Sequence, residues 1–386
     1  MNVKDFLMPS LNYFGEGSVA VLGEKVAMFE AAKPLIVTDS FLRTLEDGPV
    51  AQVIKSLEDK GIDYAIFDQV EPNPKIANCL AGLDIYDEEG CDSVITVGGG
   101  SSHDCGKGVA IAVTHGRDLK KFAGIELLSE KLPPIFAVNT TAGTASEITK
   151  HCVLTDEDTH LKFVIVSWRN VPLVSINDPY LMISVPQGLT AATGMDALTH
   201  AVECYVSANA TPLTDGCAVQ AMKIIAENLR QAVANGADIV ARENMAYASV
   251  LAGMAFNNGD LGYVHAMAHQ LGGQYDMAHG VANSILLPVV ERYNLISNPE
   301  KFAKIAEYLG EKVEGLSPLE AADKAIEAIE RLSADVGIPK NLKVMGVKRE
   351  DFELMAENAL KDGNAFSNPR KGKKAEIIEL FEQAFE

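Results

Sequence analysis

Residues 93–102 read Ser-Val-Ile-Thr-Val-Gly-Gly-Gly-Ser-Ser, a short β-branched run that ends in a glycine triplet. Such a run predicts a buried strand, and the sequence from about Asp104 predicts a helix. Glycine lets backbone N–H groups approach a ligand, and a helix N-terminus offers unpaired donors with a positive dipole end. We therefore predict a pyrophosphate-binding loop, although the spacing is not the G-x-G-x-x-G dinucleotide fingerprint. Its members are Gly98, Gly99, Gly100, Ser101 and Ser102.

The rest of the first half repeats this alternation of strand and helix. Further buried strands are predicted at 35–38, 64–67, 135–138, 163–166 and 173–176, and helices at 50–60 and 78–89. Alternation of this kind predicts a parallel sheet with both faces covered. From Pro186 onward helical periodicity replaces the strand pattern. The sequence thus predicts an α/β, Rossmann-like domain over 1–185 and an all-helical domain over 186–386.

A second loop of small and hydroxyl residues, 139–147, also follows a predicted strand. Ligands of open α/β sheets bind at the carboxyl ends of the strands, so two such loops strengthen the prediction of a nucleotide site. Asp39 follows the strand at 35–38, where a carboxylate can bind an adenosine ribose and repel a 2′-phosphate. This favours NAD over NADP. The other interpretation of Asp39 is an N-cap for a helix that begins near Ser40.

Four of the eight histidines lie between 200 and 279, and an aspartate joins them at helical spacing. Asp196 and His200 are four residues apart, as are His265 and His269, so each pair shares a helix face. With His279 they could bind Fe²⁺, Zn²⁺ or a similar metal and leave positions open for a substrate oxygen. Spacing alone leaves His265 and His269 as equal candidates. Cys204 follows His200 by four; we interpret it as a packing residue, with ligation as the alternative.

Composition excludes several other classes of function. The formal net charge is −20 without a basic cluster, which disfavours nucleic acid and anionic membranes as partners. The longest apolar run, 245–256, is too short to span a bilayer. The six cysteines form no C-x-x-C pair, and the first five residues lack the pattern of a signal peptide. We expect a cytoplasmic protein with reduced thiols.

These motifs together resemble the iron-containing (group III) alcohol dehydrogenases, within the dehydroquinate-synthase-like superfamily. The resemblance runs from Tyr13 to the C-terminus and rests on four segments, 98–104, 140–144, 194–200 and 265–279. Within the family, segments 102–108, 166–170 and 362–370 are most similar to dehydrogenases of 1,3-propanediol, and NAD-dependent methanol dehydrogenases come next. A departure is Cys204, where the family has alanine.

The resemblance implies roles that spacing could not assign. It implies metal ligation, usually of Fe²⁺, by Asp196, His200, His265 and His279, and it leaves His269 outside the ligand set. It places Phe256 at the substrate pocket and His151 near the nicotinamide. It also implies contacts with NAD from a further set of residues: Asp39, Asn73, Gly98 to Ser102, Thr140, Thr141, Thr144, Val153, Lys162 and Leu181.

The expected activity is reversible hydride transfer between a small primary alcohol or diol, best matched by 1,3-propanediol, and NAD. The metal acidifies the alcohol oxygen, and His269 either relays the proton or orients the site. The resemblance also implies a homo-oligomer. Alternatives within the family are methanol, ethanol and butanol dehydrogenases. Remote alternatives are a dehydroquinate-synthase-like lyase, which would need more Lys and Arg around the metal, and a non-catalytic metal-binding scaffold.

Overall fold

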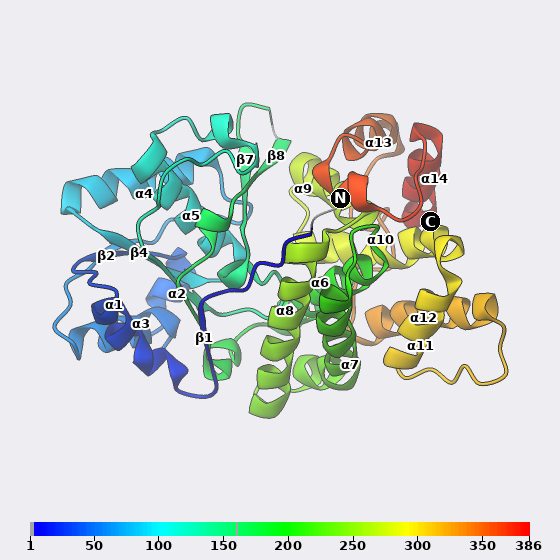
Figure 1. The fold of residues 1–386 in the computed structure, drawn as a ribbon, viewed down its shortest axis with the longest axis horizontal. Helices are drawn as coiled ribbons and strands as arrows, with labels where there is room; N and C mark the ends of the chain where they lie inside the picture. Colours follow the sequence, from blue (N-terminus) through cyan, green and yellow to red (C-terminus); the bar gives the residue numbers. More distant parts are fainter. Residues whose placement is uncertain (1–3, 160) are drawn as a thin grey trace. The chain divides into compact units, whose positions relative to one another are not determined.

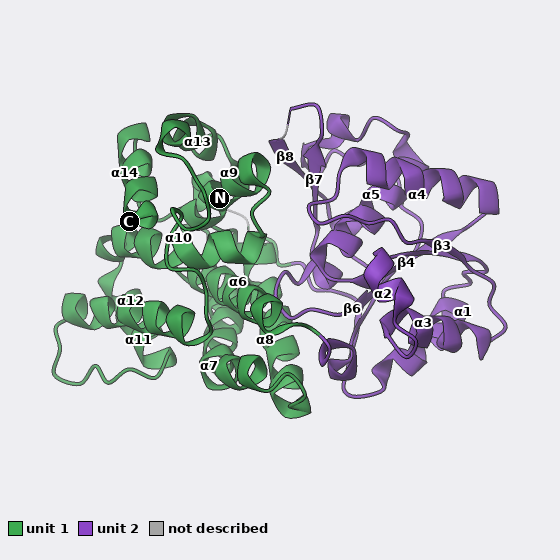
Figure 2. Ribbon diagram, turned by 180° about the vertical axis from the view of Figure 1, so that it is seen from behind, with its two compact units in different colours: residues 1–6, 185–386 green, residues 7–184 purple. Residues whose placement is uncertain are grey.

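The chain forms two compact units in a computed structural model that describes residues 4–159 and 161–386 (Figures 1 and 2). The sheet unit is Leu7–Ser184, and the helical unit is Val185–Glu386 joined by the N-terminal residues up to Phe6. The predicted division put these N-terminal residues with the sheet. They belong instead to the helical unit, where Lys4 Nζ donates a hydrogen bond to the Asn209 carbonyl at 3.0 Å. Residues 1–3, part of the segment that lacks a signal-peptide pattern, lie outside the described residues.

A six-stranded sheet of parallel strands forms the centre of the sheet unit, in the order β1-β9-β6-β4-β2-β3. The predicted strands are confirmed, and β1 was not predicted. The bounds are β1 (Leu11–Phe14), β2 (Pro34–Val37), β3 (Ala65–Phe67), β4 (Ser93–Gly98), β6 (Ile135–Asn139) and β9 (Val174–Asn177). Central pairs such as Ile95↔Phe136 fix the register.

Helices cover both faces of this sheet, which explains why its central strands are buried along their whole length. Leu35 and Val37 point to one face, where they pack with residues of α4 (Ile76–Glu89) and α5 (Gly100–His115). Ile36 points to the other face, where α1 (Leu22–Met28) and α3 (Pro49–Glu58) pack. A one-turn helix, α2 (Ser40–Thr44), follows β2. The predicted α/β architecture is confirmed.

The strand order places a topological switch point between β2 and β4. The chain passes from β2 outward to β3 and then returns to β4 on the other side of β2, so connections leave these two strands in opposite directions. Open α/β sheets bind ligands outside the carboxyl ends of such a strand pair. Asp39 follows β2 and the glycine triplet ends β4, so the sequence candidates stand at the position that topology favours.

A small second sheet, in the order β5-β8-β7, completes the sheet unit. Its strands are β5 (Gly124–Ile125), β7 (His151–Asp156) and β8 (Leu161–Val166), with β7 antiparallel to β8. Only the 163–166 part of this sheet was predicted. Short 3₁₀ turns lie between these elements: η1 (Ser18–Val21), η2 (Leu119–Phe122), η3 (Ser146–Ile148), η4 (Trp168–Asn170) and η5 (Pro179–Met182).

The helical unit contains no strand among its described residues. Its α-helices are α6 (Gln187–Val206), α7 (Pro212–Ala234), α8 (Ile239–Gly259), α9 (Tyr263–Tyr275), α10 (His279–Asn294), α11 (Pro299–Tyr308), α12 (Pro318–Asp335), α13 (Phe352–Ala359) and α14 (Lys374–Phe385). Short 3₁₀ turns are η6 (Leu295–Ser297), η7 (Arg349–Asp351) and η8 (Gly363–Ser367). No helix in the described part of the chain is both long and apolar enough to cross a membrane. The all-helical prediction for this half is confirmed.

Candidate metal centre and nucleotide loops

Helix α6 carries three polar side chains on one buried face. Asp196 and His200 lie one turn apart, and Glu203 lies a further turn along the same face. All three are almost completely inaccessible to solvent. Because a buried polar group without a partner costs free energy, this face requires polar partners from other elements.

Two other helices supply those partners. His265 lies in the first turn of α9, and His279 is the first residue of α10. The next residue, Gly280, is required by packing, because a Cβ there would stand 2.3 Å from the Ala192 carbonyl oxygen of α6. The backbone of α10 therefore lies directly against α6, which brings His279 to the same place as Asp196.

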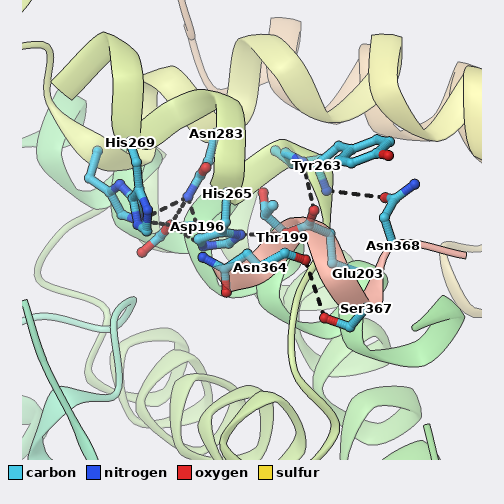
Figure 3. A network of polar contacts seen from close by, with 12 residues as sticks. Asp196, Thr199, Glu203, Tyr263, His265, His269, Asn283, Asn364, Ser367 and Asn368 are labelled. Atoms are coloured by element: carbon cyan, nitrogen blue, oxygen red, sulfur yellow. Dashed lines mark hydrogen bonds and ion pairs between the residues drawn. The ribbon is translucent and has the colours of Figure 1, made fainter. Parts of the chain in front are cut away.

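One ligand atom from each of Asp196, His265 and His279 lies within 4.8 Å of the others, and we call these residues the ligand cluster. The Asp196 Oδ1 atom is 4.0 Å from His265 Nε2 and 3.8 Å from His279 Nε2. The Asn283 Nδ2 atom donates to Asp196 Oδ1 at 2.7 Å, and it lies 3.0 Å from His265 Nε2 and 3.1 Å from His279 Nε2. Figure 3 shows Asn283 beside Asp196 and His265. Three lone pairs thus converge from a carboxylate and two imidazoles, the donor types that Fe²⁺ and Zn²⁺ accept. The residues fit such a cation.

Burial favours the neutral form of His265, the form that a metal ligand must have. Burial holds the pKa of His265 well below its usual value. Its Nδ1–H faces the Glu203 carboxylate, so the lone pair of Nε2 points into the cluster. Burial also raises the pKa of Glu203, to about 8, although the backbone N–H groups of Val264 and His265 oppose that rise. A cation bound at His265 would oppose it further and favour the carboxylate form.

Two candidate metal ligands, His200 and Cys204, are not members of the ligand cluster. The His200 ring stacks between Phe256 and His265, with ring centroids at 4.3 and 4.7 Å. Ligation by His200 stays a prediction from the resemblance. Cys204 points toward α7 and α8, where a Cβ on Gly259 would meet its sulfur at 2.6 Å. The packing interpretation of Cys204 therefore accounts for its burial.

His269 also lies outside the cluster, although spacing made it equal to His265. Its ring stacks on His279 at 5.6 Å, and its Nδ1 lies 2.7 Å from Asp362 Oδ2. Burial acts to raise the pKa of Asp362, but the neighbouring His269 outweighs it, so the pKa of Asp362 lies below its usual value. No role was predicted for Asp362, the first residue of segment 362–370, because it is 93 residues from its partner.

In the sheet unit the two predicted loops meet. Thr140 N donates to the Gly98 carbonyl at 3.0 Å. A Cβ on Gly99 would stand 2.8 Å from Thr141 Oγ1, and one on Gly100 would stand 2.9 Å from Thr144 Cγ2. The prediction that α5 begins near Asp104 is wrong: it begins at Gly100, because the missing side chains let its first turn pack against the second loop. The result is a cradle of backbone N–H groups suited to a pyrophosphate.

The remaining residues predicted to contact NAD differ in their hydrogen-bond partners and in their burial. Asp39 Oδ1 accepts from Leu42 N at 2.9 Å, so Asp39 is an N-cap, and any ribose contact would be additional. Lys162 Nζ donates to Asn73 Oδ1 at 2.7 Å, which brings these two candidates together. Val153 lies in β7. The Leu181 side chain is buried in the core, so a contact from Leu181 would have to come from its backbone.

A buried lysine, which the sequence reasoning missed, anchors the segment between the second loop and β7. The Lys107 ammonium donates to Ser146 Oγ and to three backbone carbonyls at 2.7–3.0 Å, among them that of His151. Burial lowers the pKa of Lys107. Its signal in the sequence is one charge within an otherwise apolar helix, 105–113.

Comparisons with known proteins cover both units. Residues 9–179 match the family model described as iron-containing alcohol dehydrogenase, and residues 190–385 match the C-terminal model of the Fe-containing alcohol dehydrogenase family. The chain is 63% identical over 381 residues to a 1,3-propanediol dehydrogenase of Citrobacter freundii, covering 99% of this chain and 98% of that one. It is 45% identical over 380 residues to an NAD-dependent methanol dehydrogenase of Bacillus methanolicus, covering 98% and 99%. A crystal structure of a 1,3-propanediol oxidoreductase has a TM-score of 0.97 with 63% identity and covers both chains completely.

Proposed function

We propose that this chain, which belongs to the iron-containing alcohol dehydrogenase family, interconverts 1,3-propanediol and 3-hydroxypropanal with NAD as the hydride carrier. The observation that carries the proposal is the ligand cluster, a carboxylate and two imidazoles whose ligand atoms lie close together. The identity of 63% to a 1,3-propanediol dehydrogenase supports the choice of substrate.

The helical unit holds the metal in this proposal. Asp196, His265 and His279 bind Fe²⁺, or Zn²⁺ where supply favours it, and His200 is the proposed fourth ligand. When bound, the cation makes an alcohol oxygen more acidic, and NAD accepts the hydride. The anionic Asp196 would offset part of the cation's charge, and the uncharged imidazole ligands would leave it a net positive charge.

Neighbouring side chains move the proton and shape the pocket. His269 can take a proton at Nε2 because Asp362 holds Nδ1 and orients the ring. Phe256 packs against His200 and borders the substrate with an apolar ring, which suits a short carbon chain.

The sheet unit binds the cofactor. Gly98, Gly99, Gly100, Ser101 and Ser102, with Thr140, Thr141 and Thr144, supply the backbone and hydroxyl donors for the pyrophosphate. Asp39 Oδ2 remains available for a ribose hydroxyl and disfavours a 2′-phosphate, which supports NAD over NADP. Asn73, Val153, Lys162 and Leu181 are the further proposed contacts, and His151 is the proposed neighbour of the nicotinamide.

The test is metal-dependent reduction of NAD by 1,3-propanediol, followed at 340 nm. Purified protein is stripped with a chelator and reloaded with Fe²⁺ under anaerobic conditions. We expect activity only in the reloaded sample and much less activity with NADP. The absence of turnover with every C1–C4 alcohol and diol would refute the dehydrogenase proposal.

Substrate preference is tested by kcat/KM across the same panel. Identity of 45% to a methanol dehydrogenase makes methanol the main competitor, with ethanol and butanol as further candidates. A kcat/KM for methanol above that for 1,3-propanediol would overturn the choice of substrate and leave the family unchanged. Because both units match alcohol dehydrogenase models, the lyase and scaffold alternatives lose their support.

Location and assembly complete the proposal. All six cysteines are free thiols, which supports the reducing cytoplasm as the site of action. We also propose a homo-oligomer. Size-exclusion chromatography with light scattering tests it, and a single species at the monomer mass of 41.4 kDa would contradict it.

A further inference from the structure

We infer that Glu203 is a positioning residue for the metal centre: it fixes the ring orientation and tautomer of His265 and joins helix α9 to helix α6. The inference rests on the proposed metal site. Glu203 lies on the same face of α6 as Asp196, so one helix provides both a ligand and the support for a ligand on another helix.

The start of α9 shows why a carboxylate is needed there. The N-cap residue, Gly262, has no side chain to accept from the first N–H groups of the helix. Other elements accept them instead. Asn368 Oδ1 accepts from Tyr263 N at 3.1 Å (Figure 3), and Glu203 Oε1 accepts from Val264 N at 2.7 Å. A negative side chain at this end also interacts favourably with the helix dipole.

The second oxygen of Glu203 determines which nitrogen of His265 faces the cluster. Glu203 Oε2 accepts from His265 Nδ1. With the proton on Nδ1, the Nε2 lone pair is free, in agreement with the amide of Asn283 donating to it at 3.0 Å. The two oxygens of Glu203 thus accept from two different N–H donors.

Glutamine cannot satisfy both donors. If its oxygen accepts from Val264 N, its NH₂ group faces His265 Nδ1 and requires the proton to move to Nε2, which removes the lone pair from the cluster. If the amide is turned round, two donors face each other at Val264. Glycine at 262 is part of the same arrangement, because a Cβ there would stand 2.9 Å from Glu203 Oε1 and 2.7 Å from Asn368 Oδ1.

The experiment measures metal affinity, by titration of the stripped protein with Co²⁺ and Zn²⁺, and the visible spectrum of the Co²⁺ protein. We expect Glu203→Gln to bind about 10–100-fold more weakly, the range typical for loss of a carboxylate behind a ligand histidine. Glu203→Asp keeps both oxygens and should recover part of the affinity. Gly262→Ala leaves Glu203 chemically unchanged but displaces its carboxylate, and it should also weaken binding and alter the Co²⁺ spectrum.

The matched control is Glu147→Gln, which makes the same exchange at another almost completely buried glutamate, in the sheet unit and away from the ligand cluster. It should bind Co²⁺ like the parent. Equal affinity of Glu203→Gln and the parent, or an equal loss in Glu147→Gln, would overturn the inference. If Glu203→Gln does not fold, Gly262→Ala decides, because unchanged affinity and spectrum there refute the role. A parent that binds no metal at all would instead refute the proposed function.

Discussion

The two units build their sites by opposite means. In the sheet unit the loops that would hold the nucleotide consist of glycines and hydroxyl residues, and the contacts available are backbone N–H groups at the first turn of α5. In the helical unit the ligand atoms are all side-chain atoms from α6, α9 and α10. A site built from backbone N–H groups requires small or absent side chains, so that a ligand can approach the main chain. A site built from side chains depends on the chemical identity of each one. Mutations should therefore act differently in the two units.

The largest effect is expected from loss of a ligand. His279→Ala should lose bound metal and at least about 1,000-fold in kcat/KM, because several kcal/mol of transition-state stabilisation depend on the cation. Metal content by mass spectrometry and NAD reduction at 340 nm measure the two losses. The control is His115→Gln in the sheet unit, which should keep its metal. A metal-filled His279→Ala protein would refute the ligand assignment.

His269→Ala tests whether His269, which stacks on the ligand His279, lies outside the ligand set. We expect full metal content and a fall in kcat of about 100-fold, within the range for loss of a general acid or base. Asp362→Asn should reproduce part of this fall, because Asp362 orients the ring. Loss of the metal from His269→Ala would show that His269 is a metal ligand, which would contradict its separate role in proton transfer.

In the sheet unit a single methyl group should be enough to damage the site. Gly100→Ala places a Cβ 2.9 Å from Thr144 Cγ2, so the loops must separate, and we expect KM for NAD to rise about 10-fold. Metal content should stay the same. The control is Gly216→Ala in α7, where a Cβ meets nothing within 4 Å. An unchanged KM in Gly100→Ala would show that the cradle does not bind the cofactor.

The smallest effect concerns stability and not turnover. Burial raises the pKa of Glu147 from 4.5 to about 7. The neutral carboxyl therefore stabilises the fold fully below pH 4.5, and this contribution is lost as pH rises through 7, by on the order of 1–3 kcal/mol. Glu147→Gln should gain in melting temperature relative to the parent at pH 8 and not at pH 4.5. A difference independent of pH would contradict the raised pKa.

Much of the fold could be predicted because its signals are local. Apolar strands alternate with amphipathic helices in the first half, and helical periodicity fills the second. The strand β7 was missed because half-buried and buried residues alternate along it and include threonine and histidine, unlike the more apolar central strands. The first turn of α5 was missed because its glycines are poor helix formers, and only packing against Thr144 shows why they are there.

The metal site also has a part that local sequence patterns predict and a part that depends on residues distant in the sequence. Asp196 with His200, and His265 with His269, were visible because helical spacing puts each pair on one face. Their partners were not visible, since Glu203 is 62 residues from His265 and Asn283 is 87 residues from Asp196. Spacing also could not separate His265 from His269. The structure separates them by their partners, because Glu203 and the cluster face His265 whereas Asp362 faces His269.

The contact between Gly280 and the Ala192 carbonyl has a consequence for the size of the ion. At this contact the backbone of α10 lies against the backbone of α6, with no side chain on Gly280 that could yield, so the main chain limits how His279 and Asp196 can shift relative to each other. A large ion such as Ca²⁺, which takes about six to eight oxygen ligands at roughly 2.3–2.6 Å, would need the helices to move apart and would find two nitrogens in place of oxygens. We therefore expect the site to favour small transition-metal ions over Ca²⁺.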